Sequence, residues 1–210
     1  MSRILFEGCA SGGNRFDLGI LCYFPQIWAS DDTDAVERLY IQYGTSLAYP
    51  ISAMGAHVSA VPNHQTNRAT SLKIRGDVAM SGNFGYELDL TKFTDEEKEE
   101  VKKQIEQYKE LRAFLPKSDM YRLKSPYEGN DTAWMFISED GCDIFAAYFR
   151  ILCKVNGGIY RIKFKALDEN AIYRVVNEDK EYTGAELMYI GLEVDMHGDY
   201  TSKTWRLKKV

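Results

Sequence analysis

Two short apolar runs near the start of the chain, residues 4–6 and 26–28, resemble two strands, and the length of chain between them limits how they can pair. The intervening residues 7–25 are too many for a tight hairpin and are enough for the crossover that two parallel strands require. Each run is followed at once by small or polar residues, as in functional loops. The spacing therefore favours a β–α–β-like unit with its chemistry at the carboxyl ends of the strands.

The residues after the second run have helical periodicity. Their apolar side chains recur with the spacing of one buried helix stripe. The stripe consists of Val36, Leu39, Tyr40, Tyr43 and Leu47. A strand, an acidic turn and a helix in this order are typical of a β/α barrel. Another strand is expected at residues 84–90, which read FGYELDL.

A second helix is expected over residues 94–116. Thr94, followed three residues later by Glu97, makes a capping box, and acidic residues fill the first turn. Its apolar face combines Val101, Ile105 and Tyr108 with Leu111 or Leu115. Pro116 ends the helix.

From residue 117 onward the pattern indicates antiparallel strands. The clearest alternation places Tyr160, Ile162, Phe164 and Ala166 on one face and basic residues on the other. Gly141 and Gly157 follow Asp140 and Asn156 at turn positions, as in hairpins. The expected core of this region includes Trp134, Phe136, Tyr148 and Phe164. A face that binds sugar is the alternative interpretation of these aromatic residues.

Charge and composition exclude several classes of partner. The net charge of −5 without a basic stripe argues against nucleic acid. No apolar run is long enough to span a bilayer, and the first residues, MSRILFEGC, lack the apolar segment of a signal peptide. We therefore expect a cytoplasmic location and no membrane partner. The cysteines lack CxxC spacing, which predicts reduced thiols at Cys9, Cys22, Cys142 and Cys153.

Two histidines raise the question of a metal site. His57 and His64 flank Pro62 in a polar segment, without an acidic or cysteine companion nearby. Zinc sites need three or four such ligands, so we interpret these histidines as part of a loop scaffold. No metal and no cofactor are expected.

Four sequence blocks together resemble one enzyme family. They are CASGGNRFD at residues 9–17, PQIWASDDTDAVERLYIQYGTSLAYP at 25–50, MGAHVSAVPNHQT at 54–66 and GYELDL at 85–90. The chain resembles glycoside hydrolase family 36, the bacterial α-galactosidases of melibiase type. Asn14 and Leu18 depart from the family pattern, where Gly and Pro are usual. Asn tolerates the left-handed backbone conformation that Gly would supply.

The resemblance implies a fold and a domain division. Residues 1–93 would form the last strands and helices of a (β/α)8 TIM barrel, starting near its seventh strand, with residues 26–28 as the final barrel strand. Residues 94–116 would form a connecting helix, and residues 117–210 an antiparallel β-sandwich. The missing N-terminal part of the barrel would then be a partner of this chain, and a homo-oligomer is a further possibility.

The resemblance also implies a retaining mechanism, in which one carboxylate attacks the sugar and another protonates the leaving oxygen. The family's general acid/base falls on Asp31. Its nucleophile lies on a strand with a Lys-Trp-Asp type motif, which these 210 residues lack. We therefore expect the chain alone to be inactive.

Substrate contacts are implied for Cys9, Ser11, Gly12, Trp28 and Asp31. Each has an alternative interpretation: Cys9 as a buried structural cysteine, Trp28 as core, and an acid before a helix as a cap. Asp32 and Asp34 are interpreted as caps.

Two functions from different classes remain open. The first is an α-galactosidase acting on oligosaccharides such as melibiose or raffinose, with galactosyl transfer or hydrolysis of α-N-acetylgalactosaminides as variants within the family. The second is a noncatalytic, carbohydrate-binding remnant. The absent nucleophile distinguishes them, because only the first requires a second piece of protein.

Overall fold

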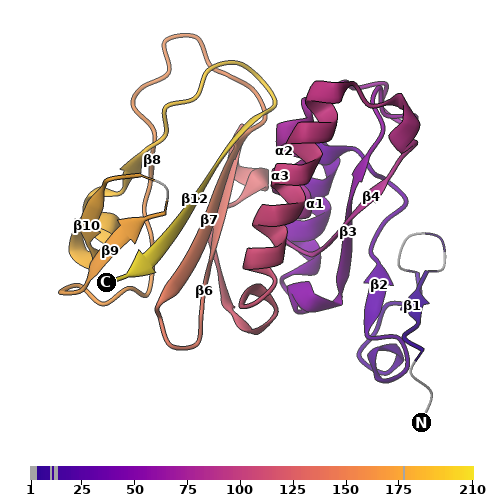
Figure 1. Cartoon of the computed structure of the whole chain (residues 1–210), viewed down its shortest axis with the longest axis horizontal. Coiled ribbons are helices and arrows are strands. Elements are labelled where there is room, and N and C mark those ends of the chain that lie inside the picture. The colour runs from indigo at the N-terminus through magenta and orange to yellow at the C-terminus, as the bar shows by residue number, and fades with distance from the viewer. Residues whose placement is uncertain (1–3, 10, 12–13, 177) are drawn as a thin grey trace. The chain divides into compact units, whose positions relative to one another are not determined.

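The computed structural model describes residues 4–9, 11, 14–176 and 178–210. The chain divides into two compact units, Met1–Glu110 and Leu111–Val210. The first contains a parallel sheet with helices, and the second is built from antiparallel strands (Figure 1). In the described part of the chain, no helix is both long and apolar enough to cross a membrane.

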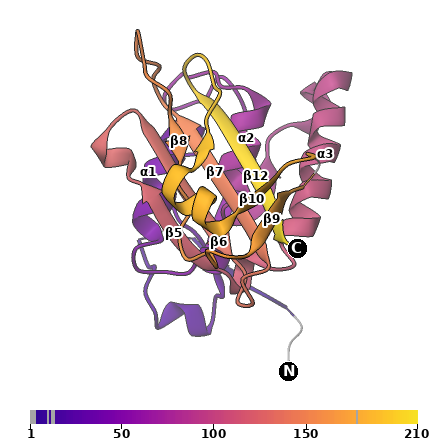
Figure 2. The same cartoon turned by 90° about the vertical axis from the view of Figure 1, so that its left-hand side faces the viewer.

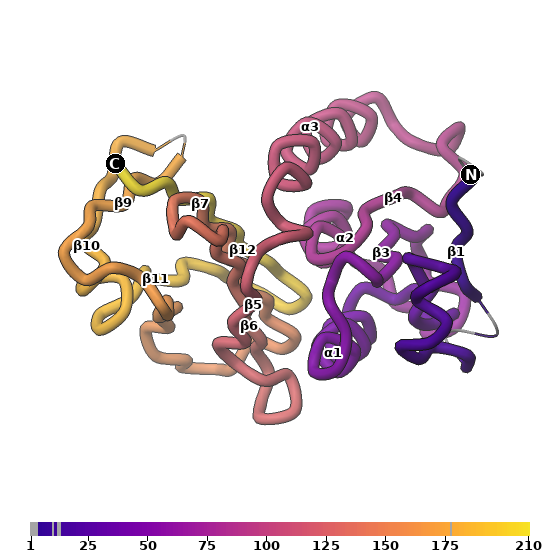
Figure 3. The backbone as a smooth tube through the Cα atoms, turned by 90° about the horizontal axis from the view of Figure 1, so that it is seen from below, coloured from indigo at the N-terminus to yellow at the C-terminus, as the bar shows by residue number. Residues whose placement is uncertain are grey.

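The parallel sheet of the first unit has the strand order β1-β2-β3-β4. Its strands are β1 (Glu7–Gly8), β2 (Gln26–Trp28), β3 (Met54–Ser59) and β4 (Asn83–Glu87). Its helices are α1 (Ala35–Thr45), α2 (Leu72–Ala79) and α3 (Asp95–Leu111), with short turns η1 (Ile20–Cys22), η2 (Ile51–Ala53) and η3 (Leu90–Lys92). The three helices lie on one face of the sheet (Figures 1 and 3). Parallel strands connected by helices are the arrangement that the sequence predicted.

Two strand predictions need correction. Residues 4–6 are exposed and lie before the first strand, because β1 is Glu7–Gly8. The segment around His57, interpreted as a polar loop, is strand β3, so two parallel strands follow β2 and residues 26–28 are not the final strand. The sequence MGAHVS gave no alternation, because β3 is buried almost along its whole length. The strand predicted at 84–90 is confirmed only in part, because β4 is Asn83–Glu87 and Leu90 already begins the turn η3.

Helix α1 begins where the acidic turn ends. Asp34 is its N-cap, and its Oδ1 accepts hydrogen bonds from the backbone N–H groups of Val36 (2.8 Å) and Glu37 (3.1 Å). Val36 and Leu39 are buried as predicted. Leu47 is 66% exposed, because the helix ends at Thr45.

The predicted capping box starts α3. The backbone N–H of Thr94 donates to Glu97 Oε2 (2.9 Å), and the backbone N–H of Glu97 donates to Thr94 Oγ1 (3.2 Å). Val101 packs against a buried cluster of the parallel sheet and α2 that includes Ala56, Val58 and Leu72. The capping-box prediction is therefore confirmed.

The second unit is built on a six-stranded antiparallel sheet with the order β10-β9-β12-β7-β6-β5. Its strands are β5 (Asp119–Lys124), β6 (Asp131–Ile137), β7 (Asp143–Arg150), β9 (Ile172–Val175), β10 (Glu181–Thr183) and β12 (Thr201–Lys209). A small sheet pairs β8 (Arg161–Ile162) with β11 (Leu192–Glu193), and the short helical turns are η4 (Leu115–Lys117), η5 (Pro126–Glu128) and η6 (Glu186–Ile190). In Figure 2 the yellow strand β12 lies beside β7, with which it pairs.

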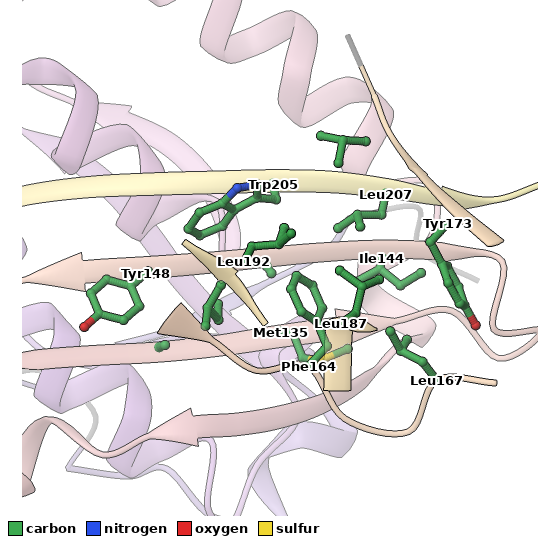
Figure 4. Packing of buried hydrophobic residues seen from close by; sticks show 14 of the residues in the cluster. Met135, Ile144, Tyr148, Phe164, Leu167, Tyr173, Leu187, Leu192, Trp205 and Leu207 are labelled. Atoms are coloured by element: carbon green, nitrogen blue, oxygen red, sulfur yellow. The ribbon is translucent and has the colours of Figure 1, made fainter. Parts of the chain in front are cut away.

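The core of this unit lies between the large sheet and the later segments. Phe164, Leu187 and Leu192 pack with Ile144 of β7 and Leu207 of β12 in one buried cluster (Figure 4). Burying this apolar surface is the main stabilising contribution available to the unit.

The four aromatic residues predicted for the core are all buried. Only Tyr148 and Phe164 belong to the cluster of Figure 4. Trp134 and Phe136 alternate with cluster residues along β6 and so point to the opposite face of the sheet, because side chains of a strand alternate. The prediction that these four residues share one core is therefore wrong.

The strand expected at residues 160–166 is shorter than predicted. Only Arg161 and Ile162 pair as β8. The backbone N–H of Phe164 donates instead to the carbonyl of Leu187 (3.1 Å), and Ala166 takes a positive φ of 57° that ends an extended segment. The alternation of apolar and polar residues continues in the sequence beyond the β8–β11 pair, because Phe164 is buried although it does not belong to a strand.

Candidate active site at the carboxyl ends of the parallel strands

The parallel register brings the ends of four strands to one edge of the sheet. Gly8 lies opposite Ile27, Trp28 opposite Gly55, and Ser59 opposite Glu87. The segments after these strands therefore meet at the same edge. Cys9 follows β1 directly, and Asp31 follows β2 by three residues. The structure thus places Cys9, Trp28 and Asp31 at one edge.

Asp31 is the exposed carboxylate of a turn whose neighbouring carboxylates are used for structure. The backbone N–H of Asp32 donates to Ser30 Oγ (3.1 Å), and that of Asp34 donates to Asp32 Oδ1 (3.0 Å). Asp34 caps α1 as predicted, whereas Asp32 closes the turn before the helix. Asp31 is left facing solvent, where a substrate can reach it.

A buried arginine of α1 donates hydrogen bonds to the backbone of this turn. Arg38 is 2% exposed, and its guanidinium donates from Nη2 to the carbonyl of Ser30 (2.6 Å) and from Nε to the carbonyl of Asp32 (2.7 Å). A longer bond runs from Nη1 to the carbonyl of Gly55 (3.5 Å). Burial lowers the pKa of Arg38 to about 10, although the negative charges of the nearby carboxylates oppose this. The side chain therefore remains a cation at neutral pH.

Trp28 lies between charged and aromatic neighbours. The guanidinium carbon of Arg38 is 4.3 Å from the centroid of the Trp28 ring, a cation–π distance. The His57 ring is tilted by 32° against Trp28 at a centroid distance of 4.8 Å. His57 Nδ1 in turn lies 3.7 Å from Glu87 Oε2. The contacts link the ends of β2 and β4 through the middle of β3.

Gly55 allows Trp28 to approach β3. A Cβ atom at this position would lie 2.9 Å from Glu7 Oε1 and 3.1 Å from Cε3 of Trp28. Cβ atoms almost never make contacts under 3.0 Å, so a larger residue would shift the flexible end of Glu7 and crowd the Trp28 ring. Glycine therefore leaves the space in which the Trp28 ring lies against β3.

The loop after β3 is fastened to the turn that carries Asp31. Ser59 Oγ donates to the carbonyl of Thr33 (2.7 Å), and the buried Asn63 donates from Nδ2 to Thr33 Oγ1 (3.1 Å). Arg68 pairs with the buried carboxylate of Asp34. Although burial opposes it, this pairing raises the pKa of Arg68. These bonds hold the loop after β3 and the turn that carries Asp31 together.

The remaining predicted contacts come from the segment after β1. The Cys9 side chain is exposed, so Cys9 is not the buried structural cysteine of the alternative interpretation. Ser11 is exposed and takes the left-handed φ of 55°, whereas Asn14 does not take a positive φ. Gly12 lies outside the described residues.

Sequence reasoning missed the residues that support the site. Arg38, Glu87 and Gly55 were not singled out, and His57 was assigned to a loop. The available signal was the pattern of α1, where Arg38 and Gln42 occupy positions on the same stripe as Val36 and Leu39. Among the described residues, no three His, Cys, Asp or Glu side chains gather closely enough to hold a metal ion.

An exposed carboxylate at the carboxyl ends of parallel β–α strands corresponds to one member of the carboxylate pair that glycoside hydrolases use. The family model "Melibiase" matches residues 1–117, and the model of the glycosyl hydrolase family 36 C-terminal domain matches residues 131–207. The chain belongs to the melibiase family, with the C-terminal domain of glycosyl hydrolase family 36.

Similar proteins agree along nearly the whole chain. The α-galactosidase AgaA of Geobacillus stearothermophilus is 55% identical over 99% of this chain and 28% of its own length. The probable α-galactosidase G of Aspergillus terreus is 49% identical over 98% of this chain and 28% of its own length. The crystal structure of AgaA superposes with a TM-score of 0.96 over 99% of this chain and 29% of that one. This chain spans about 28% of the length of the curated relatives it matches.

Proposed function

We propose that these 210 residues supply the acid/base part of an α-galactosidase, a retaining hydrolase that releases terminal α-linked galactose from oligosaccharides such as melibiose or raffinose. The observation that carries the proposal is the exposed carboxylate of Asp31 in a turn held by its neighbours. A crystal structure of a doubly substituted AgaA, 54% identical to this chain, contains raffinose.

In the proposed mechanism Asp31 acts twice. As the general acid it gives a proton to the glycosidic oxygen while the leaving group departs, and as the general base it then takes a proton from water. The nucleophile must lie about 5–5.5 Å from it in a retaining enzyme. These 210 residues contain no Lys-Trp-Asp type motif, so we assign the nucleophile to a strand outside them.

The fold assignment that goes with this function places β1 to β4 in a (β/α)8 TIM barrel, and the antiparallel strands in a β-sandwich. The continuous parallel order of β1 to β4, with helices on one face, supports the barrel. We keep the division into 1–93 as barrel, 94–116 as connecting helix and 117–210 as sandwich. The rest of the barrel is then the first partner of this chain.

Substrate binding is assigned to the same edge of the sheet. Cys9, Ser11 and Gly12 would contact galactose hydroxyl groups from the segment after β1, and Trp28 would offer an apolar ring surface to the sugar. The exposure of Cys9 and Ser11 and the position of Trp28 beside the Asp31 turn support these roles.

A chimera tests the proposal directly. These 210 residues replace the matching segment of AgaA, and hydrolysis of raffinose is measured for the chimera and for its Asp31→Asn and Asp32→Asn variants. Asp31→Asn should lower kcat/KM roughly 100- to 10,000-fold, the usual contribution of a general acid/base. Asp32→Asn keeps the oxygen that closes the turn, so it should retain most of the activity.

The contrary results are equally specific. A folded chimera that binds galactose without hydrolysing raffinose would favour the noncatalytic, carbohydrate-binding function. Full activity of the Asp31→Asn chimera would refute the role of Asp31. The 210 residues alone should show no hydrolysis, and activity from them would contradict an external nucleophile.

A further inference from the structure

Arg38 is a buried cation whose position is not explained by the formation of α1. A guanidinium removed from water costs free energy unless hydrogen bonds compensate for the lost hydration. Arg38 is only 2% exposed, and an apolar side chain of similar size would pack the helix without this cost. Its hydrogen bonds therefore indicate what it is for.

Those bonds hold the backbone on both sides of one residue. Nη2 binds the carbonyl of Ser30 at 2.6 Å, and Nε binds the carbonyl of Asp32 at 2.7 Å. Asp31 stands between the two residues whose carbonyl groups are held. The planar fork of the guanidinium fixes both carbonyl groups relative to α1, so the backbone of Asp31, and with it the direction of its Cα–Cβ bond, is held in place.

The same guanidinium also restrains the neighbouring aromatic ring. It lies over Trp28 at 4.3 Å, and Trp28 is restrained further by the His57 ring at 4.8 Å. One buried group thus contacts both the ring at the end of β2 and the turn that follows it.

We propose that Arg38 is a positioning residue that sets the geometry of Asp31 for proton transfer. The inference rests on the proposed function and names a residue that acts through the acid/base rather than on the substrate itself. Its consequence is selective: the reaction should suffer most when the leaving group needs a proton.

Arg38→Lys is the sharpest variant. Lysine keeps the charge and most of the stem, but a single ammonium cannot hold two carbonyl groups in the geometry of the fork. Arg75 provides a matched control on α2. It is 5% exposed and donates from Nη1 to the carbonyl of Ser59 (2.6 Å), and no contact joins it to Ser30, Asp32 or Trp28 among the interactions of the described residues.

The experiment uses the chimera of these 210 residues with the remainder of AgaA. kcat/KM is measured for raffinose, whose leaving group needs a proton, and for 4-nitrophenyl α-galactoside, whose phenolate departs without one. Arg38→Lys should lower kcat/KM for raffinose roughly 10- to 100-fold, as expected for a misplaced catalytic group, and for the nitrophenyl substrate about 3-fold or less. Arg75→Lys should lower the Tm without changing the ratio of the two values.

The outcomes separate this inference from the proposed function. If Asp31→Asn abolishes raffinose hydrolysis while Arg38→Lys lowers both substrates in parallel, the positioning role is overturned and the function stands. If Asp31→Asn is fully active, the function itself fails. In the Asp31→Asn background, Arg38→Lys should leave the ratio unchanged, because the group that it positions is gone. Should Arg38→Lys not fold, Arg38→Gln, which retains one carbonyl bond, must show the same selective loss.

Discussion

The two units bury an arginine in different ways. Arg38 of the first unit is 2% exposed and donates hydrogen bonds to main-chain carbonyl groups. Arg150 of the second is 4% exposed and binds a carboxylate, Asp131 Oδ1, through Nε (3.1 Å) besides the carbonyl of Met196 through Nη1 (2.5 Å). Each guanidinium lies over an aromatic ring, at 4.3 Å from Trp28 and 4.5 Å from Tyr160. Burial lowers the pKa of Arg38, while for Arg150 the hydrogen bond and charge of Asp131 outweigh burial and raise the pKa.

The difference shows what each cation stabilises. Carbonyl groups of a turn are local, so Arg38 fixes the geometry of a loop at the edge of the sheet. Asp131 and Arg150 lie directly opposite each other on β6 and β7, so their ion pair favours one register of the antiparallel sheet. The first arrangement supports a site and the second supports a fold.

The largest expected effect comes from removing the carboxylate of the second arrangement. Asp131→Ala leaves Arg150 buried without its counter-charge, which should lower the free energy of unfolding by about 3–5 kcal/mol. Urea unfolding followed by circular dichroism measures this. The double replacement Asp131→Leu with Arg150→Met removes both charges and should cost less. A loss under about 1 kcal/mol for Asp131→Ala would show that the pair is not the stabilising feature.

Removal of the first cation should have a smaller effect on stability. Arg38→Met leaves no unpaired buried cation and frees the carbonyl groups of Ser30, Asp32 and Gly55, for an expected loss of about 1–3 kcal/mol. The same urea titration compares the two variants. If Arg38→Met destabilised the protein more than Asp131→Ala, the distinction between a positioning and a structural arginine would fail.

The N-terminus of α3 contains no buried charge and provides a reference for the two preceding predictions. Thr94→Ala removes the hydroxyl that accepts from the backbone N–H of Glu97, so about 1 kcal/mol should be lost. Glu97→Gln keeps the reciprocal hydrogen bond to Thr94 and should cost less. Thermal unfolding of the two variants tests the order, and equal losses would contradict the capping box.

The smallest effect is a pH dependence in the second unit. The hydrogen bond from Lys209, at 3.0 Å, lowers the pKa of Asp168. A carboxyl group with a depressed folded-state pKa contributes its stability above the unfolded value near 4, and this contribution is lost as the pH falls through the folded value. Asp168→Asn should therefore flatten the fall of Tm between about pH 5 and pH 2. If the Tm of Asp168→Asn fell with pH as steeply as that of the unaltered protein, the pair of Asp168 and Lys209 would not cause this pH dependence.

Much of the fold was predictable because its signals are local. The N-cap at Asp34 and the capping box at Thr94 and Glu97 depend on a few adjacent residues, and both are confirmed. Strand β3 was missed because a strand buried along its length has no alternation to detect. The end of β8 was missed because the burial of Phe164 is decided by η6 and not by a neighbouring strand.

The candidate site was predictable only in part. The family pattern selected Asp31, Trp28 and Cys9, which the fold places at one edge. Arg38 was not selected, because its partners are backbone carbonyl groups, and a backbone carbonyl has no signature in a sequence. For the same reason the link from Trp28 through His57 to Glu87 appears only once the strands are in register.

The close approach at Gly55 has a consequence for protein engineering. One hydrogen atom at this position sets the clearance between the indole of Trp28 and the carboxylate of Glu7. Gly55→Ala would displace the flexible end of Glu7 or the indole of Trp28 by a few tenths of an ångström, without altering any group proposed to carry protons. A library searching for altered sugar preference can therefore begin at position 55, where an added methyl group meets the ring proposed to contact the sugar.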